Sequence, residues 1–197
     1  MIRLVLATHN LHKVRELERI LGPALDGIEL LAYKGPSAVE DGASFEENAL
    51  IKARAAAAFT GLPAIADDSG ISVDALGGQP GIDSAHYSGA RDDAANVARL
   101  LAALGDAADR AAHFTCAAAL IIPGPPHREF VEFGVWPGTI LSEATGLNGF
   151  GYDPVFKPAG HSVSAAELRP DEKNAISHRA LAFRELMPTV RRELLGQ

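Results

Sequence analysis

The sequence predicts an α/β fold, in which strands and amphipathic helices alternate along the chain. The first sign is an apolar strand, Ile2–Ala7, which a polar turn separates from a helical repeat over Leu11–Leu21. The second is another apolar run, Pro63–Ala66, which ends in two aspartates. The third is a pair of strand-like segments, Ala112–Ile122 and Glu129–Trp136, which are joined by a proline-rich turn and are therefore expected to pair antiparallel.

The first half of the chain adds one strand and one helix to this pattern. A strand is expected at Ile28–Tyr33, where apolar residues dominate. Ser44 and Glu47 form a capping-box pattern ahead of an alanine-rich helix over Asn48–Phe59. This helix has the clearest start signal in the sequence.

The second half alternates loops with helical segments. Glycine and proline over residues 77–89 predict an irregular loop, and a helix is expected over 92–104. A second glycine-rich loop covers Gly146–Asp153. The tail Asp171–Leu195 has helical composition, and we expect Pro188 to break it into two pieces.

The composition indicates one soluble globular domain spanning residues 1–197. Hydrophobic residues make up 47% of the chain and charged residues 22%, which suffices for one core. The net charge of −7 argues against a partner that is a nucleic-acid polymer. Cys116 is the only cysteine, and no apolar stretch is long enough to span a membrane. We therefore expect a protein of the cytoplasm.

Four polar groups of residues suggest phosphate and metal chemistry. Asp67 and Asp68 close an apolar run, which is a common way to hold a divalent cation, although a simple polar turn is the alternative. The segment Thr8–Lys13 joins a strand to a helix, where backbone N–H groups, a hydroxyl and an ammonium can converge on a phosphate. The alternative there is an N-cap by Asn10 or Thr8. The glycine pattern of a Walker loop or a dinucleotide-binding turn is absent from this segment.

The third group lies around the start of the alanine-rich helix. Glu40-Asp41 and Glu46-Glu47 are acidic, and Asn48 and Lys52 lie one turn apart on the same helix face. The alternative is that at least one of Glu46 and Glu47 only complements the helix dipole.

The fourth group lies in the second half of the chain. The loop Gly149–Asp153 carries aromatic rings, and Lys173 and the Ser177–Arg179 run add cations, so that a base could stack while a phosphate is neutralised. The alternative is that Phe150 and Tyr152 only anchor the loop on the core. Each of these groups is weak evidence when taken alone.

Six motifs occur in a fixed order along the chain. They are Ala7-Thr8-His9-Asn10 with Lys13 and Glu16; Ser44-Phe45 with Glu47-Asn48-Ala49 and Lys52-Ala53-Arg54; Ala66-Asp67-Asp68-Ser69-Gly70; Gly77-Gly78 with Pro80-Gly81; Gly149-Phe150-Gly151-Tyr152-Asp153-Pro154; and Lys173 with Ser177-His178-Arg179. In this order they resemble the inosine/xanthosine triphosphate pyrophosphatase (Ham1-like) family. The resemblance extends from about Leu4 to about Phe183.

The resemblance implies an elongated mixed β-sheet with flanking helices and two lobes around a central cleft, the ITPase-like (Maf/Ham1) fold. It also implies a homodimer that uses Mg²⁺ to hydrolyse ITP, dITP or XTP to the monophosphate and pyrophosphate, which removes deaminated purines from the nucleotide pool. Asp68 is then the catalytic carboxylate. The substrate contacts carried over in the same way are Thr8, His9, Asn10, Leu11, His12, Lys13, Ser69, Phe150, Gly151, Tyr152, Asp153, Lys173, His178 and Arg179.

The chemistry of the residues agrees with this assignment. Breaking a phosphoanhydride places charge on the leaving pyrophosphate, which Mg²⁺, Lys13 and Lys52 are expected to stabilise. Asp68, alone or with Glu40 as a second metal ligand, can hold Mg²⁺ and orient or deprotonate the attacking water. The chain departs from the family pattern at His86, where relatives often carry arginine.

Two other classes of protein fit parts of the pattern. A haloacid-dehalogenase-type phosphatase would carry its aspartate pair at the end of the first strand, where this chain has Thr8-His9-Asn10. A nucleotide-binding regulator would keep the phosphate cradle but would not need Asp68. Release of pyrophosphate from ITP is expected only of the pyrophosphatase.

Overall fold

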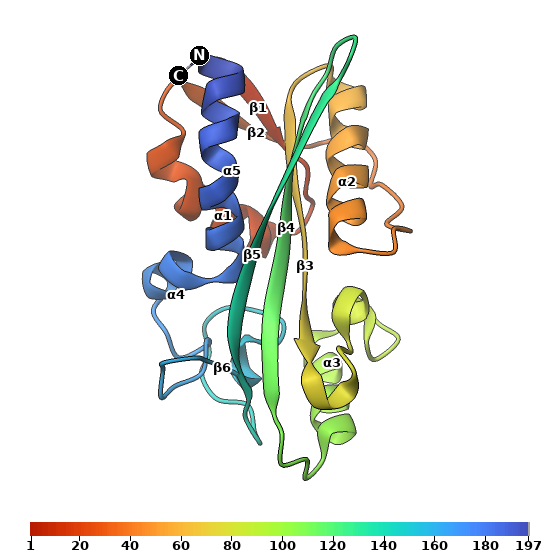
Figure 1. The fold of residues 1–197 in the computed structure, drawn as a ribbon, viewed down its shortest axis with the longest axis vertical. Coiled ribbons are helices and arrows are strands. Elements are labelled where there is room, and N and C mark those ends of the chain that lie inside the picture. The colour runs from red at the N-terminus through yellow and green to blue at the C-terminus, as the bar shows by residue number, and fades with distance from the viewer. Residues whose placement is uncertain (197) are drawn as a thin grey trace. The chain divides into compact units, whose positions relative to one another are not determined.

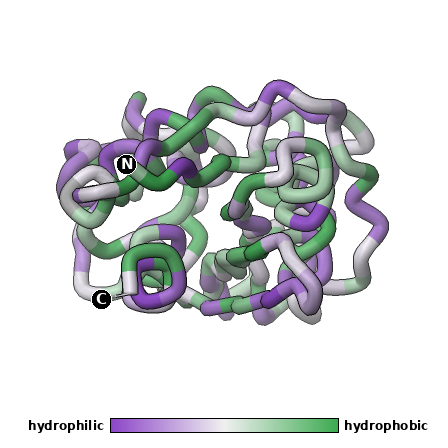
Figure 2. Tube along the Cα trace, turned by 90° about the horizontal axis from the view of Figure 1, so that it is seen from above, coloured by the Kyte–Doolittle hydropathy of each residue, from purple (hydrophilic) through white to green (hydrophobic). Residues whose placement is uncertain are grey.

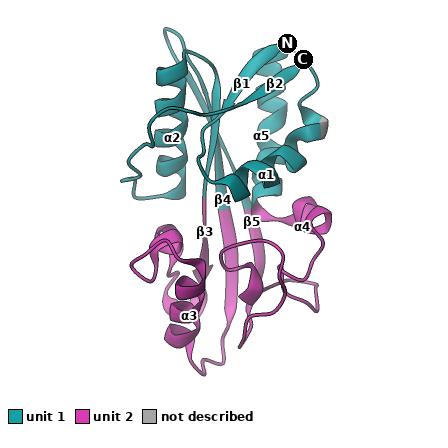
Figure 3. Ribbon diagram, turned by 180° about the vertical axis from the view of Figure 1, so that it is seen from behind, with its two compact units in different colours: residues 1–68, 116–134, 179–197 teal, residues 69–115, 135–178 magenta. Residues whose placement is uncertain are grey.

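A computed structural model describes residues 1–196 and separates the chain into two compact units (Figure 3). Unit 1 consists of Met1–Asp68, Cys116–Gly134 and the segment from Arg179 onwards. Unit 2 consists of Ser69–Thr115 and Val135–His178. Three long strands run from one unit into the other, so the chain crosses the boundary repeatedly.

Six strands form one sheet in the order β2-β1-β3-β4-β5-β6 (Figure 1). The strands are β1 Ile2–Leu6, β2 Ile28–Ala32, β3 Ala64–Val73, β4 Ala111–Ile122, β5 Arg128–Ile140 and β6 Phe156–Pro158. The helices are α1 Leu11–Leu21, α2 Phe45–Thr60, α3 Asp93–Leu104, α4 Pro170–Ile176 and α5 His178–Leu195. β1 pairs parallel with both β2 and β3, whereas β5 and β6 pair antiparallel. The predicted mixed α/β fold is therefore confirmed.

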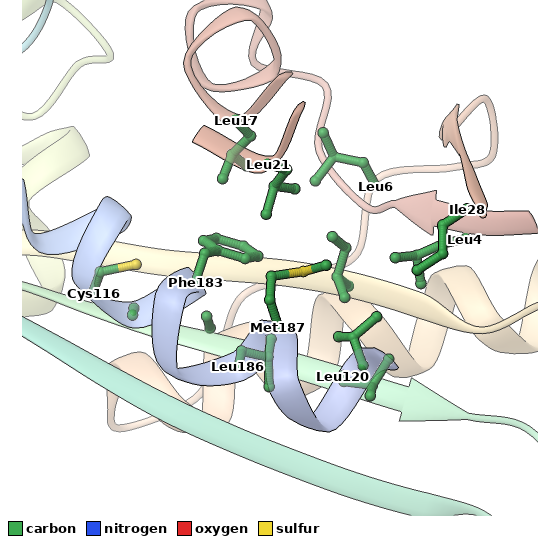
Figure 4. Close-up of a cluster of buried hydrophobic side chains, with 14 residues drawn as sticks. Leu4, Leu6, Leu17, Leu21, Ile28, Cys116, Leu120, Phe183, Leu186 and Met187 are labelled. Carbon is green, nitrogen blue, oxygen red and sulfur yellow. The ribbon is translucent and has the colours of Figure 1, made fainter. Parts of the chain in front are cut away.

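In unit 1, successive residues of each strand point to opposite faces of the sheet, and helices cover both faces. Leu4 and Leu6 belong to a cluster that α1 and α5 cover with Leu17, Phe183 and other apolar side chains (Figure 4). Val5, which lies between them, and Ala7 belong to the cluster that α2 covers with its alanines. The period of two along the strands thus sets which helix each side chain meets.

The helix α5 shows the matching pattern of a period near 3.6. Figure 2 shows hydrophobic and hydrophilic residues alternating around the helix that leads to the C-terminus. Its buried members include Phe183, Leu186 and Val190, which lie three or four residues apart.

Unit 2 has a core of its own. Leu100 and Leu104 of α3 pack with Ile71 and Val73 of β3 in one cluster. The same cluster holds an aromatic group, described below, that lies on β4 and β5 and in the segment after them. Within residues 1–196, no helix combines the length and apolar character needed to cross a membrane.

Two expectations about where elements end are wrong. β3 does not end at its two aspartates but continues to Val73, because both carboxylates find charged partners and the apolar pattern resumes at Ile71. Pro188 does not break the tail helix, because it lies on the exposed side of α5, where water can bind the carbonyl that loses its helical donor. The break lies instead at Ser177, whose backbone is extended.

Smaller differences concern caps and short elements. The helix α2 begins at Phe45, and Ser44 caps it as predicted, since its side chain accepts from the Glu47 N–H at 3.1 Å. The Glu47 carboxylate accepts from the N–H of Ala43, one residue before the position that a capping box requires. Part of the predicted irregular loop is a 3₁₀ helix, Gly81–His86, and β6 had no clear sequence signal.

Candidate active site

The two aspartates of β3 lie in unit 1 and face opposite sides of the sheet. Asp67 has the same parity as Ile65 and shares the face covered by α1 and α5, whereas Asp68 shares the parity of Ala66 and the face covered by α2. The Asp67 side chain is fully buried, and 13% of the Asp68 side chain is exposed. Adjacent residues of the same type therefore occupy different environments.

Asp67 is the centre of a buried network of charges. Its Oδ2 accepts from Lys13 Nζ at 2.9 Å and from Arg179 Nη2 at 3.0 Å. Arg179 also pairs with Glu16 of α1, and the guanidinium is 2% exposed. Among residues 1–196, Asp67 Oδ1 has no hydrogen-bond partner. Two carboxylates and two cations thus balance one another inside unit 1.

The charges around Asp67 determine its ionisation. Burial would raise the pKa of this carboxyl, but Lys13 and Arg179 outweigh burial and hold the pKa well below its usual range. The pKa of Arg179 is raised, because Asp67 and Glu16 outweigh its burial. Both groups stay charged, and the nearby Cys116 thiol has a raised pKa because it is buried and lies near Asp67.

Asp68 belongs to a second, more open cluster on the α2 face. Lys52 Nζ donates to Asp68 Oδ1 at 2.7 Å and to Glu40 Oε2 at 2.6 Å. Asn48, one turn before Lys52 on α2, donates its amide N–H to Asp68 Oδ2 at 3.4 Å. One ammonium therefore holds two carboxylates that lie 28 positions apart in sequence.

The two carboxyls of this cluster shift in opposite directions. Burial raises the pKa of Asp68, and the negative charge of Glu40 adds to this, although Lys52 partly opposes it. Burial alone would raise the pKa of Glu40, but the Lys52 ammonium outweighs burial and lowers it. The pKa of Lys52 is raised, because the carboxylates around it outweigh its burial. Asp68 is thus the carboxyl in this cluster whose proton affinity is increased.

The turn between β1 and α1 holds the predicted phosphate cradle. Asn10 caps α1, since its Oδ1 accepts from the N–H groups of His12 and Lys13 at 2.9 and 3.2 Å. Thr8 Oγ1 accepts from the Asn10 N–H at 3.2 Å. Leu11 is exposed at the start of the helix. The capping role is confirmed, and the phosphate contacts from this turn stay a prediction.

The predicted base loop lies in unit 2 and is tied down at several points. Asp153 Oδ2 accepts from the Phe150 N–H at 2.8 Å and from Lys173 Nζ at 2.6 Å. The Lys173 ammonium also lies 5.1 Å from the centroid of the Phe150 ring. The Gly151 N–H donates to Asp93 Oδ2 at 2.8 Å. These bonds define the conformation of the loop.

Tyr152 and His178 are the buried aromatic members of the predicted site. The Tyr152 hydroxyl donates to the Ser84 carbonyl at 2.8 Å, and burial raises its pKa. The His178 ring stacks on Phe114 with the centroids 4.6 Å apart and the planes 8° apart. Trp136 stacks with both Phe114 and His178, and its ring centroid lies 6.2 Å from that of His178. Both predicted residues therefore have fixed ring orientations.

The structure distributes the predicted residues between the two units. Unit 1 brings together Lys13, Glu40, Lys52, Asp68 and Arg179 in the two clusters on either side of β3. Unit 2 holds the predicted set Ser69, Phe150, Gly151, Tyr152, Asp153, Lys173 and His178. His178 and Arg179, which are adjacent in sequence, belong to different units.

Sequence reasoning paired Asp67 with Asp68 as a candidate cation site, whereas in the structure the two carboxylates face opposite sides of the sheet. It also did not foresee the contacts of several residues that organise these sites. Asp67 is the buried partner of Lys13 and Arg179, and Glu16 completes that network. Asn48 and Asp93 bind groups that belong to the predicted sites. The i, i+3 spacing of Lys13 and Glu16 on one helix was the available signal for the buried network.

The part of the chain that the structure describes contains no group of three or more His, Cys, Asp or Glu side chains arranged for a metal. Asp68 and Glu40 form a pair of carboxylates gathered on one cation. Such a pair matches the needs of Mg²⁺, which is held through one or two carboxylates while waters and substrate phosphates complete its shell.

Comparisons with known proteins show which proteins this chain is similar to. Residues 4–189 match the model of the Ham1 family. A dITP/XTP pyrophosphatase of Leifsonia xyli subsp. xyli is 56% identical, over 97% of this chain and 96% of the relative. The solved structure of a HAM1 protein from Coxiella burnetii has a TM-score of 0.87 and 43% identity, covering 96% of this chain and 98% of that one. The crystal structure of a nucleoside-triphosphatase/dITP/XTP pyrophosphatase from Mycobacterium abscessus has a TM-score of 0.75 and 46% identity, covering 96% of this chain and 100% of that one.

Proposed function

The chain belongs to the Ham1 family, and we propose that it hydrolyses dITP, ITP and XTP to the nucleoside monophosphate and pyrophosphate in a Mg²⁺-dependent reaction. The Leifsonia xyli relative, which carries the name dITP/XTP pyrophosphatase, is 56% identical over nearly the full length of both chains. The observation that carries the proposal is the Asp68–Lys52–Glu40 cluster on β3 and its neighbours.

Asp68 is proposed as the residue that acts on the attacking water. Burial raises the pKa of Asp68 in the absence of metal, and its carboxylate is proposed to accept a proton from that water. The water oxygen attacks the α-phosphorus, and the bond from that phosphorus to the oxygen bridging to the β-phosphorus breaks. Asn48 and Lys52 hold the two carboxylate oxygens of Asp68, so the orientation of the base is fixed before substrate arrives.

Asp68 and Glu40 are proposed to hold Mg²⁺. The fit rests on their shared contact with Lys52, which shows that both carboxylates reach one small cation, and on their acceptor oxygens. When bound, Mg²⁺ would neutralise charge that develops on the phosphate oxygens. Lys52 remains an ammonium in this environment and is proposed to contribute positive charge at the same place.

Lys13 is proposed to bind the phosphate tail from the start of α1. Its ammonium is held by Asp67 at 2.9 Å, and 15% of the side chain is exposed. The Asp67 network would therefore set the position of Lys13 while compensating its charge. Thr8, Asn10, Leu11 and His12 belong to the same turn and are proposed to line the phosphate path.

Selection of the base is proposed for the unit 2 residues. Hypoxanthine and xanthine present a 6-oxo acceptor and a protonated N1, whereas adenine presents an amino donor and an unprotonated N1. A donor placed to bind the 6-oxo oxygen would face the amino donor of adenine. Both donors would then stay unpaired, which lowers the affinity for adenine. Phe150 is partly exposed and can stack on a base, and Tyr152 and His178 are held in fixed orientations nearby in the same unit.

We further propose that the protein works in the cytoplasm as a homodimer. The single cysteine is buried and reduced, which suits a reducing compartment. Sedimentation equilibrium of the purified protein tests the dimer, and a monomeric mass over the micromolar range would contradict it.

The test of the proposed function is a panel of dITP, XTP, ITP, GTP and ATP at fixed Mg²⁺, with pyrophosphate and orthophosphate measured separately. We expect pyrophosphate as the first product from the first three nucleotides and much slower turnover of GTP and ATP. An Asp106→Asn variant, changed at an exposed site in unit 2, serves as the matched charge control. Orthophosphate as the first product would indicate a phosphatase instead, and binding without turnover would indicate a regulator.

A further inference from the structure

The carboxylate of Glu40 is carried by a segment that has no regular secondary structure. Residues 33–44, between β2 and α2, contain no helix or strand. The position of Glu40 therefore depends on how the segment is attached to its surroundings on either side. At its C-terminal end, Gly42 N–H donates to Asn48 Oδ1 at 2.9 Å and Ala43 N–H to Glu47 Oε2 at 2.6 Å.

At the other end, His9 holds the segment through both ring nitrogens. His9 Nε2 lies 3.0 Å from the Gly35 carbonyl oxygen, and Nδ1 lies 3.3 Å from Ser37 Oγ. A carbonyl oxygen only accepts, so Nε2 must carry a proton. In the neutral ring, Nδ1 then accepts from the Ser37 hydroxyl, so that both contacts are satisfied at once.

Tyr33 also contacts the stretch Gly35–Ser37 that His9 binds. Its ring lies 5.4 Å from the His9 ring, and its hydroxyl donates to the Pro36 carbonyl at 3.1 Å. Tyr33 is itself buried against the core and meets Phe59 edge-on at 5.8 Å. A β-carbon at Gly35 would collide with the Tyr33 ring, so the backbone lies directly on it.

We propose that His9 is a positioning residue, which clamps Gly35–Ser37 and thereby keeps the Glu40 carboxylate beside Lys52 and Asp68. This role rests on the proposed function, since it assigns His9 to the placement of Glu40 and not to the triphosphate. Glu40 lies three residues after the clamp and two residues before the Gly42 anchor. Among the described residues, loss of the clamp therefore leaves the N-terminal side of Glu40 supported by Tyr33 alone. The imidazole then acts on the reaction only through Glu40.

The first test measures the clamp itself, without nucleotide or metal. The segment contains one trypsin site, Lys34–Gly35, directly at the clamped residues. We expect His9→Ala to speed cleavage there about tenfold, because loss of two hydrogen bonds releases the segment. His9→Gln, which can still donate to the Gly35 carbonyl, is expected to restore most of the protection, and His161→Ala serves as a control histidine in unit 2. Unchanged cleavage of the His9→Ala protein would overturn the proposal.

The second test asks whether His9 acts through Glu40. We expect His9→Ala to lower kcat about fivefold to tenfold and to raise the Mg²⁺ concentration for half-maximal rate, with little change in the KM for dITP. In a Glu40→Gln background, the same substitution is expected to have almost no further effect. Independent, multiplicative effects of the two substitutions would show that His9 does not act through Glu40 and would overturn the proposal. If the wild-type protein hydrolyses none of the nucleotides, the proposed function fails, while the trypsin comparison still decides on the clamp.

Discussion

Unit 1 and unit 2 hold their predicted functional side chains by different means. In unit 1, ion pairs on the two faces of β3 hold Asp67 and Asp68, and Lys13 and Arg179 keep the buried Asp67 ionised. In unit 2, carboxylates that accept backbone N–H groups shape the loop, and aromatic packing fixes the rings. Within the described part of the chain, unit 2 has a single buried pair at this loop, Lys173 with Asp153, and not a network of four charges. The comparison teaches that a charge network is costly to break at any member, whereas a loop with separate anchors loses them one at a time.

The largest effect is expected at the open cluster of unit 1. Asp68→Asn should lower turnover by about a thousandfold or more, because the proton acceptor is lost. Nucleotide affinity should stay within about tenfold, since Lys13 and Lys52 remain. Steady-state kinetics and equilibrium nucleotide binding measure the two quantities. Near-normal turnover of this variant would remove the proposed role of Asp68.

The next largest effect is on stability, at the buried network of unit 1. Arg179→Met should lower the free energy of unfolding by about 3 to 5 kcal/mol, because it leaves Asp67 and Glu16 buried without this cation. Arg192→Met is the matched control on the same helix, where the side chain is 58% exposed and a change within about 0.5 kcal/mol is expected. Urea denaturation measures both. Equal losses in the two variants would contradict the network.

A smaller effect is expected at one loop anchor of unit 2. Asp93→Ala removes the acceptor of the Gly151 N–H and should raise the KM for dITP about threefold with kcat nearly unchanged. Asp92→Ala is the matched control, because Asp92 caps α3 and its loss should cost about 1 kcal/mol of stability without affecting the KM. If both variants changed the KM alike, the loop would depend on the helix as a whole and not on this anchor.

The smallest effect concerns a surface ion pair of unit 1. Hydrogen bonds from Arg54 lower the pKa of Glu129 in the folded state. The pair therefore stabilises the fold fully above the unfolded pKa of about 4.3. This stabilisation is lost as the pH falls through the lower pKa of the folded state. Glu129→Gln should therefore cost less than about 1 kcal/mol at pH 7, and the difference from wild type should shrink below about pH 4. Urea denaturation at several pH values measures this. A difference that grew toward acid pH would have the wrong sign.

The order of elements could be predicted because hydrophobic periodicity and cap residues are local signals. Ile2–Ala7, the Ser44 cap and the Ala112–Ile122 strand all follow from neighbours within a few positions. Placing the end of β3 at Asp67 and Asp68 was wrong because the partners that make these carboxylates compatible with a strand lie far away. Arg179 comes 112 positions after Asp67.

The candidate site was predictable in its residues but not in its grouping. Lys52 and Asn48 share a helix face that the sequence reveals. The assignment of Arg179 to a buried pair with Glu16 required knowing that α1 and α5 cover the same face of the sheet. Long-range packing of this kind leaves no periodic trace in a single sequence.

The parity of β3 has a consequence for how the chain tolerates insertions and deletions. Adding or removing one residue within β3 before Asp67 would turn the strand over and exchange the faces of the two aspartates. Asp68, the acid proposed to act on water, would then be buried beneath α1 and α5. The buried Asp67 fixes the register of β3, because only the correct register places its carboxylate beside Lys13 and Arg179. Insertions and deletions should accordingly be tolerated in loops such as residues 123–127, where a change in length does not shift the register of a buried charge.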